Sequence, residues 1–413
     1  MKTGLKNANI LLPDGVDMEK WSVIACDQYT SDEAYWRETE KIVGKAPSTL
    51  RLTLPEIFLG RDDTSARIRE IHAKMTEYLD GGVFRPLDDG MIYVRRTLSD
   101  GKVRQGIVAA LDLDEYDFSP DSRVLCRATE ATVTDRIPPR KAVRNGAPLE
   151  LPHILVLIDD PSGSVIEAIG KQTDELVKLY DFTLMQNGGR ITGWQLDAVR
   201  QKNVMSALDA LRRAALEKYG SELLYLVGDG NHSLATAKAC WEDLKAAGAP
   251  ADHPARYALV EITNLQSKDL VFEPIHRVLK HCDAAALTAF LRARFAGVDG
   301  RTGEQTVVMV TAAGEKTLSL DPPTAKLAVG SLQKALDGYL ALHPETEIDY
   351  IHEEEAVRRL MREEDAVGFL LPAIEKNAFF ESIIRDGVLP RKTFSMGVSD
   401  DKRFYCEARK IVL

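Results

Sequence analysis

The chain of 413 residues is 45% hydrophobic and 28% charged, a composition that excludes disordered, collagen-like and coiled-coil proteins. At roughly 150 residues per domain, this length predicts two or three domains. Its 53 Lys and Arg and 63 Asp and Glu give a net charge of -10, so the molecule as a whole repels polyanions. We therefore expect no nucleic-acid partner.

The N-terminal segment and the cysteines indicate the cellular compartment. Residues 1–21 contain one short apolar run followed by Pro, Asp and Glu, which is not the pattern of a secretory signal. No window reaches the roughly 18 apolar residues of a membrane-spanning helix. The five cysteines lie far apart without a Cys-x-x-Cys pair, so neither a disulfide framework nor a zinc ribbon is predicted. We expect a cytoplasmic protein without a membrane partner.

Taken in chain order, the first elements are a strand and two helices. Residues 21–30 are typical of a strand that leads into a helix over 32–43, with Ser31 as the N-cap. Apolar residues at three- or four-residue spacing then predict a helix over 64–80, which a pair of glycines ends.

A hairpin and an extended region follow. The Asp100-Gly101 pair between two β-rich runs predicts a hairpin over 91–113. In the next region, adjacent prolines at 138 and 139 argue against a regular helix. The apolar run 153–158 is then typical of a buried strand.

The second half of the chain alternates segments with helical periodicity and segments with the periodicity of strands. We predict a helix around 169–180, a hairpin around 187–189, a long helix over 197–219, a strand, loop and helix over 221–248, and a strand over 255–265. This order indicates an α/β or α+β fold with mixed sheets and interspersed helices. We expect two intimately associated subdomains, residues 1–150 and residues 151–413, the second carrying the Gly-containing loop.

That loop is the first candidate site, because free N–H groups and the helix dipole favour an anion where a strand ends and a helix begins. Asp229 is a candidate to hold a metal ion or to orient His232. His232 is a candidate hydrogen-bond donor to phosphate, a candidate general base or a candidate metal ligand. The residues expected to contact a phosphate are Gly228, Gly230, Asn231 and Ser233. The alternative is a tight turn with only local hydrogen bonds, since the loop is neither a Walker A nor a Rossmann motif.

Cationic residues gather in a second segment. Arg127 and Arg136 are candidates for a phosphate or carboxylate clamp, because a guanidinium can bind such groups with two parallel hydrogen bonds. The alternative is a solvated basic loop paired with Asp135 and Glu130. Glu130 is also a candidate general base.

Three further segments contribute single candidates. His276 and Arg277 follow Pro274 at an expected helix start and are candidates for the same phosphate site. Lys392 is another candidate cation near the C-terminus. Asp27 ends the first predicted strand and is either catalytic or the start of a turn.

Several motifs, in order along the chain, resemble the bacterial family known as domain of unknown function 1015. They are CDQYTSDEAYW, PSTLRLTLPEIFLG, RATEATVTDRIPPRKAVRNGAPLELPHILVLIDDP, VGDGNHSLATAK, FEPIHRVL, LPRKTFSMG and KRFYCEARKI. The resemblance covers nearly the whole chain and implies one conserved unit, but no particular reaction.

The family signature Asp-Gly-His-His-Arg corresponds here to residues 229–233. Asp229, Gly230 and His232 carry over, whereas Asn231 and Ser233 replace the first His and the Arg. The positive charge of that Arg is then expected from Arg277 or from the cluster between Arg127 and Lys141.

The signature is also similar, more distantly, to the phosphate-binding loop of the sulfiredoxin and ParB-like superfamily, which includes free serine kinases. This resemblance implies binding of ATP or ADP, with Mg²⁺ held by Asp229.

Three hypotheses follow. The first is an enzyme that binds a nucleotide or a small phosphorylated metabolite and transfers phosphate in serine metabolism, with Glu130 or Asp27 as base. The second is a metal-dependent hydrolase whose ligands include Asp229 and His232. The third is a ligand-binding or regulatory protein without turnover. All three share a small anionic ligand.

Overall fold

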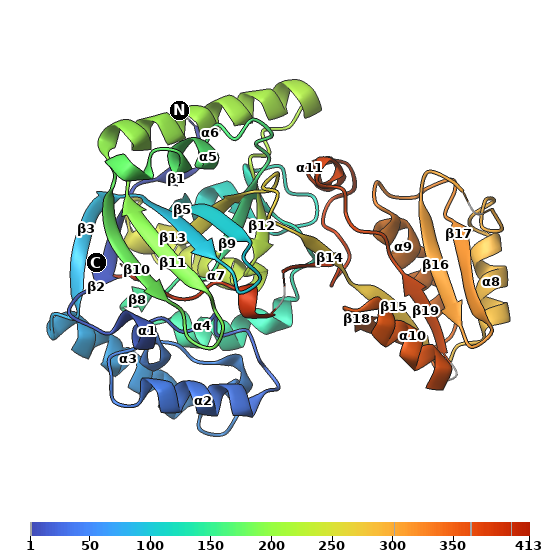
Figure 1. Ribbon diagram of the computed structural model, residues 1–413, viewed down its shortest axis with the longest axis horizontal. Coiled ribbons are helices and arrows are strands. Elements are labelled where there is room, and N and C mark those ends of the chain that lie inside the picture. Colours follow the sequence, from blue (N-terminus) through green and yellow to red (C-terminus); the bar gives the residue numbers. More distant parts are fainter. Residues whose placement is uncertain (1, 301, 364–365, 398) are drawn as a thin grey trace. The chain divides into compact units, whose positions relative to one another are not determined.

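The structure is a computed structural model that describes residues 2–300, 302–363, 366–397 and 399–413 (Figure 1). Contacts within the chain divide it into two compact units. Unit 1 comprises Met1–Leu270 together with Val398–Leu413, and unit 2 comprises Val271–Gly397. Unit 2 is thus an insertion in unit 1, and the chain divides near residues 270 and 397 rather than at residue 150.

A large mixed sheet forms the centre of unit 1, in the order β10-β11-β4-β5-β13-β9-β12-β7-β6, with β1 beside β5. Most neighbours are antiparallel, but β13/β9, β12/β7 and β7/β6 are parallel. One sheet therefore joins strands from both sides of residue 150. Its strands are β1 (Leu5–Lys6), β4 (Ile92–Thr97), β5 (Val103–Asp112), β6 (Tyr116–Asp117), β7 (Cys126–Ala128), β9 (Leu155–Ile158), β10 (Val177–Thr183), β11 (Arg190–Gln195), β12 (Tyr225–Asp229) and β13 (Tyr257–Asn264).

Helices cover both faces of this sheet (Figure 1). Successive side chains of a strand point to opposite faces. In β5, Ile107 accordingly belongs to the same core as Trp241 of α7, and Val108 belongs to the same core as Trp36 of α2. The helices of unit 1 are α1 (Met18–Trp21), α2 (Glu33–Val43), α3 (Thr64–Asp80), α4 (Ile137–Arg144), α5 (Ile166–Gly170), α6 (Ala198–Tyr219) and α7 (Asn231–Ala246). Two small antiparallel pairs complete the unit, β2 (Ala8–Pro13) with β3 (Phe84–Gly90) and β8 (Leu149–Glu150) with β21 (Arg409–Lys410).

Elements with a strong local pattern form as the sequence predicts. The mixed α/β class is confirmed, and so are the helix α3, the hairpin β4/β5 and the long helix α6. Asp197 caps α6, because its side chain accepts a hydrogen bond from the Arg200 N–H at 2.8 Å. Gly220 ends α6 in the left-handed conformation, with φ of 65°.

Other predictions are wrong for identifiable reasons. The N-cap of α2 is Asp32 and not Ser31, since the Asp32 carboxylate accepts the Tyr35 N–H at 3.1 Å. The strand expected over 21–30 is reduced to an isolated bridge between Ile24 and Phe404.

Two helix predictions also fail. The helix expected over 169–180 stops at Gly170, and the chain continues as strand β10 because that segment pairs with β11. The adjacent prolines do not block a helix, since they occupy the first turn of α4, where a missing N–H costs little.

Unit 2 has its own antiparallel sheet, in the order β17-β16-β19-β15-β18. Residues 276–280, expected to start a helix, instead form strand β15 of this sheet. The elements of the unit are β14 (Phe272–Pro274), β15 (His276–Lys280), α8 (Ala284–Arg292), β16 (Thr306–Thr311), β17 (Gly314–Ser319), α9 (Ala328–Leu340), β18 (Glu347–Ile351), α10 (Glu354–Glu363), β19 (Ala366–Leu370), α11 (Lys376–Asp386) and β20 (Phe394–Met396). None of the helices in the described parts of the chain has the length and apolar character of a membrane span.

Candidate active site

The candidate site begins at the turn between β12 and α7. β12 ends at Asp229 and α7 begins at Asn231, so Gly230 is the single connecting residue and has φ of 80°. Gly230 is the N-cap, and α7 has no side-chain cap hydrogen bond. Helix N-termini whose first N–H groups have no side-chain acceptor are suited to bind an anion.

Replacing Gly230 with Ala should damage this turn. An added Cβ would lie 3.1 Å from Ile154 Cγ1 and 3.2 Å from Ile154 Cα, and the positive φ disfavours any L-residue with a side chain. We expect a loss of about 1–3 kcal/mol in the free energy of unfolding, measured by urea titration. Gly248, also at positive φ with no atom near its Cβ position, is the matched control, because Gly248→Ala has the same strain without the contact. Equal losses would show that the contact with Ile154 costs nothing.

Three strands bring side chains to the same sheet edge as this turn. β7 and β12 are parallel, and β9 is antiparallel to them with Leu155 opposite Asp229. The residue after β7, Thr129, accepts a hydrogen bond from Asn231 Nδ2 at 3.4 Å. His232 Nε2 accepts the Val133 N–H at 3.3 Å, from the loop that follows β7. His232 thereby ties that loop to the start of α7.

His153, two residues before β9, is the centre of the polar cluster. Its Nε2 lies 3.0 Å from Ser233 Oγ and 3.6 Å from Asp27 Oδ2. Its Nδ1 lies 3.0 Å from the Tyr405 hydroxyl, which accepts the Cys26 N–H at 3.0 Å. The side chain is buried, with 7% of its surface exposed. Four separate segments therefore meet at one imidazole.

The C-terminal segment supplies a cation as well as Tyr405. Lys402 Nζ lies 3.2 Å from Asp229 Oδ2, and the Lys402 side chain is only 13% exposed. This ammonium group therefore stands beside the N-terminus of α7. Charge in such a sheltered place is screened less by salt than charge on an open surface.

Burial and charge act in opposite directions on this cluster. Burial alone raises the pKa of Asp27, but the charge of His153, the hydrogen bond to His153 and the charge of Lys402 hold that pKa well below its usual range. Burial lowers the pKa of His153, whereas the charge of Asp27, the hydrogen bond to it and the charges of Asp229 and Glu56 raise it above its ordinary value. The result is an ionised Asp27 beside a histidine that holds its proton more tightly.

These shifts predict how stability depends on pH. Because the pKa of His153 is higher in the folded chain, its contribution is complete below about pH 6.5 and is lost as pH rises through the folded pKa. The pKa of Asp27 is depressed, so its contribution is present above about pH 4 and is lost in acid. We expect His153→Gln to flatten the fall of the unfolding free energy above pH 6.5, measured by denaturant titration across pH. An unchanged slope would contradict the pairing.

A cavity of about 150 Å³ adjoins the cluster. His153, Ser233 and Tyr405 line it on one side, and its wall includes the apolar side chains of Leu52, Leu54, Leu59, Met75, Val143, Leu149, Leu151 and Leu259. Arg140 and Glu56, which also line it, form an ion pair. Burial raises the pKa of Glu56, although the charge of Arg140 opposes that rise. The cavity thus joins a largely apolar wall to an imidazole, two hydroxyl groups and an ion pair.

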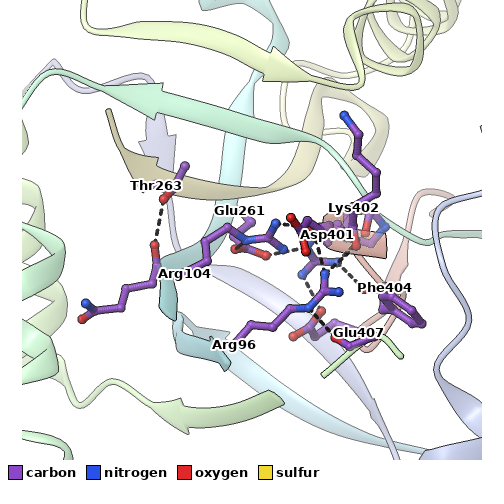
Figure 2. Close-up of polar contacts among 12 residues, drawn as sticks. Arg96, Arg104, Glu261, Thr263, Asp401, Lys402, Phe404 and Glu407 are labelled. Carbon is purple, nitrogen blue, oxygen red and sulfur yellow. Dashed lines mark hydrogen bonds and ion pairs between the residues drawn. The ribbon is translucent and has the colours of Figure 1, made fainter. Parts of the chain in front are cut away.

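Buried charges hold the C-terminal segment in place (Figure 2). Arg403 Nε donates to Glu261 Oε2 at 2.8 Å, and its Nη2 donates to Glu407 Oε2 at 2.7 Å. Arg96 Nη1 donates to the Asp401 carbonyl at 3.0 Å, and Arg104 Nη1 donates to the same carbonyl at 2.7 Å. Both arginines come from the central sheet, so the backbone around Lys402 is fixed from β4 and β5.

The residues predicted from the sequence fall into two sets. The first set comes from two segments of unit 1, and hydrogen bonds or ion pairs link each member to groups of this sheet edge. It comprises Asp27 and, from the β12–α7 turn, Asp229, Asn231, His232 and Ser233. Gly228 and Gly230 shape the end of β12, and Glu130 is half-buried one residue beyond Thr129.

The arginines of the cationic segment are placed differently. Arg127 is buried, and its guanidinium donates to the Val124 carbonyl at 3.2 Å and to Ser221 Oγ at 3.0 Å. Val124 precedes β7 and Ser221 precedes β12, whereas Asp229 is the last residue of β12. The guanidinium of Arg127 is therefore bound at the opposite end of these two strands from Asp229. Arg136 is exposed at the N-cap of α4. The role of these two arginines in anion binding stays a prediction.

His276, Arg277 and Lys392 belong to unit 2. His276 Nδ1 accepts the Leu371 N–H at 3.1 Å, and burial lowers the pKa of this histidine. Arg277 is buried and donates to Gln333 Oε1 at 2.8 Å and to the Lys392 carbonyl at 2.9 Å. These contacts support the core of unit 2, and a role in phosphate binding stays a prediction.

Sequence reasoning missed His153, Lys402 and Tyr405. A signal for His153 exists, because a residue that precedes a strand lies at the edge where an antiparallel neighbour ends. Lys402 and Tyr405 lie in the motif KRFYCEARKI, but nothing local marks them as neighbours of α7.

The geometry does not fit a metal centre. Among the described residues, no group of three or more His, Cys, Asp or Glu side chains is placed to hold a metal ion. Asp229 faces the Lys402 ammonium group instead. The expected Mg²⁺ at Asp229 therefore lacks support.

Comparison with known proteins places the chain by sequence. Residues 12–339 match the family described as "Protein of unknown function (DUF1015)". The chain belongs to this family. No curated protein matches it. The match spans most of unit 1 and continues into unit 2, and it confirms the family resemblance. The motifs LPRKTFSMG and KRFYCEARKI lie beyond the matched residues.

Three solved structures are similar at low sequence identity. A conserved hypothetical protein from Pyrococcus furiosus has a TM-score of 0.35 at 14% identity, over 74% of this chain and 95% of that chain. A free serine kinase in complex with AMP has a TM-score of 0.39 at 14% identity, over 74% and 92%. SbnI with a C-terminal truncation, from Staphylococcus aureus, has a TM-score of 0.39 at 11% identity, over 72% and 85%. These likenesses are distant, and function must be argued from the site itself.

Proposed function

We propose that unit 1 is an enzyme that binds a nucleotide or a small phosphorylated metabolite and transfers its phosphoryl group to or from a hydroxyl compound such as serine. The observation that carries the proposal is the Lys402 ammonium group beside an α7 N-terminus that has no side-chain cap. A cation and a helix N-terminus together attract a dianionic phosphate more strongly than either does alone.

The second support is the proton chemistry of His153. A general base works best when its pKa lies near the working pH, and histidine is the side chain whose ordinary pKa is nearest to neutral. The charge of Asp27 and the hydrogen bond to it raise the pKa of the buried His153 above that ordinary value. The depressed pKa of Asp27 makes that carboxylate a weak base. We therefore assign proton transfer to His153 and assign to Asp27 the task of holding the imidazolium in place.

The third support is the cavity beside the cluster. An engineered apolar cavity of about 150 Å³ holds a benzene molecule. The cavity here has that volume and a largely apolar wall, so it can take a ring or a small apolar group of the ligand. The phosphate would then lie at the α7 N-terminus.

The test is a binding panel followed by a turnover assay on the full chain. AMP, ADP, ATP, phosphoserine and inorganic phosphate are titrated by calorimetry and thermal shift, since a ligand that binds only the folded state raises apparent stability. Product formation from the ligands that bind is then followed by phosphorus NMR. Binding with turnover is the expected result. Saturable binding without turnover would instead favour the ligand-binding or regulatory protein, and no binding at all would remove the proposed ligand class.

A further inference from the structure

The hydroxyl group closest to the proposed base comes from the chain itself. Ser233 Oγ lies 3.0 Å from His153 Nε2, and the other ring nitrogen is taken by Tyr405. A substrate hydroxyl could reach Nε2 only by displacing Ser233. The geometry therefore favours proton transfer from Ser233 over direct transfer from a substrate.

The other nucleophilic groups of the cavity wall are less suited to attack. Burial, with the nearby charge of Asp27, raises the pKa of the Cys26 thiol to about 12, so the thiol stays neutral. Burial also raises the pKa of Tyr405 well above its usual range. The hydroxyls of Thr53 and Thr236 donate to backbone carbonyls, those of Thr49 and His232, at 2.9 Å and 2.7 Å. Among these five wall residues of the described chain, Ser233 and Tyr405 pair their oxygen with a nitrogen of His153, and Ser233 is the aliphatic alcohol of the two.

We propose that Ser233 is a catalytic nucleophile that carries the phosphoryl group as a covalent phosphoserine between donor and acceptor. This inference rests on the proposed phosphoryl transfer and names its intermediate. Ser233 is the third residue of α7, so a phosphate on its oxygen lies within the first turn, where the helix dipole stabilises negative charge.

The chemistry balances without a further reactant. The Ser233 oxygen attacks phosphorus and forms the new O–P bond, while the bond to the donor's leaving oxygen breaks and its electron pair stays with that oxygen. The Ser233 proton passes to His153 Nε2, while the Tyr405 oxygen accepts the Nδ1 hydrogen. In the second half, the oxygen of an acceptor hydroxyl or water attacks the phosphoserine and the bond between phosphorus and the Ser233 oxygen breaks. Ser233 regains the proton that His153 took, and the proton of the attacking hydroxyl passes to solvent.

The experiment uses the full chain and two donors, acetyl phosphate and ATP. Acetyl phosphate is a small reactive donor that does not depend on recognition of a nucleotide. Intact mass and peptide mapping should find one phosphoryl group per chain, on Ser233. Ser233→Ala should abolish the label, and His153→Gln should slow labelling by about 10²-fold and remove its rise with pH. Thr76→Val is the matched control, since the Thr76 hydroxyl donates to the carbonyl four residues earlier in a helix, as that of Thr236 does, but does not line the cavity, and labelling should stay unchanged.

The outcomes separate this inference from the proposed function. Nucleotide binding and turnover that persist in a folded Ser233→Ala variant, with no phosphoserine from either donor, would overturn the nucleophile and leave the proposed function standing. Labelling of Ser233 by acetyl phosphate without binding of any nucleotide or metabolite would support the nucleophile and reject the proposed ligand class. A label on another residue would overturn the inference. Should Ser233→Ala fail to fold, the wild-type peptide map decides the question, and Ser233→Thr, which keeps a hydroxyl, should retain part of the label.

Discussion

Replacing Arg403 with Ala should lower the free energy of unfolding of unit 1 by about 3–5 kcal/mol. Arg403 is 2% exposed and binds both Glu261 and Glu407, which are 3% and 0% exposed as side chains. Removing the guanidinium leaves two carboxylates buried with one fewer cation between them. That residual charge costs far more than a missing surface ion pair, which is worth about 0–1 kcal/mol.

Denaturant titration of the full chain, followed by tryptophan fluorescence, measures this loss. All four tryptophans of the sequence lie in unit 1, so the signal reports that unit alone. Arg213→Ala is the control, because Arg213 is 65% exposed and lies 3.5 Å from Asp209. We expect the control to change stability by less than about 0.5 kcal/mol. A loss below about 1 kcal/mol in Arg403→Ala would show that the buried network does not anchor the C-terminal segment.

Replacing Lys402 with Ala should weaken binding of a phosphate-bearing ligand by about 10- to 100-fold. The change removes a sheltered cation and leaves the Asp229 carboxylate uncompensated beside the α7 N-terminus, where it repels the ligand. Both effects act on the anion and not on the apolar cavity. Affinity for a ligand without phosphate, such as adenosine, should therefore change little.

Calorimetry with the tightest ligand of the binding panel tests this prediction. Lys402→Arg keeps the charge and should retain much of the affinity. Lys141→Ala is the matched control, because Lys141 also forms an ion pair in unit 1 but with the exposed Asp243. The double change Lys402→Met with Asp229→Asn removes both charges and should bind more tightly than Lys402→Ala. Unaltered affinity in Lys402→Ala would place the phosphate elsewhere.

The sequence predictions succeed for elements that depend on residues near one another in the chain, and they fail for elements that depend on distant residues. The α3 helix and the β4/β5 hairpin depend on side chains a few residues apart, and the sequence predicts both. Residues 177–180 fail as a helix, since pairing with β11 decides their conformation. Residues 276–280 fail in the same way, because β18 and β19 flank them on both sides.

The candidate site shows the same division. The turn at Gly230 and the start of α7 can be predicted, because a strand, a glycine and a helix are consecutive in the chain. Asp27 and Ser233 can be selected from the sequence as polar residues at element ends, but their common partner His153 cannot. His153 joins them only because β9 runs antiparallel to β12, which places its first residues at the edge where β12 ends.

The sequence by itself determined an acidic chain with a mixed α/β fold, membership of a family, and a loop whose backbone suits an anion. Only the tertiary structure decided which cation stands at that loop. Lys402 reaches it because Arg403 and Glu407, whose charges are typical of a surface segment, are buried in mutual ion pairs inside unit 1. The burial of Arg403 depends on Glu261, which lies more than 100 residues away in the sequence. No pattern of neighbouring residues predicts that these two side chains meet.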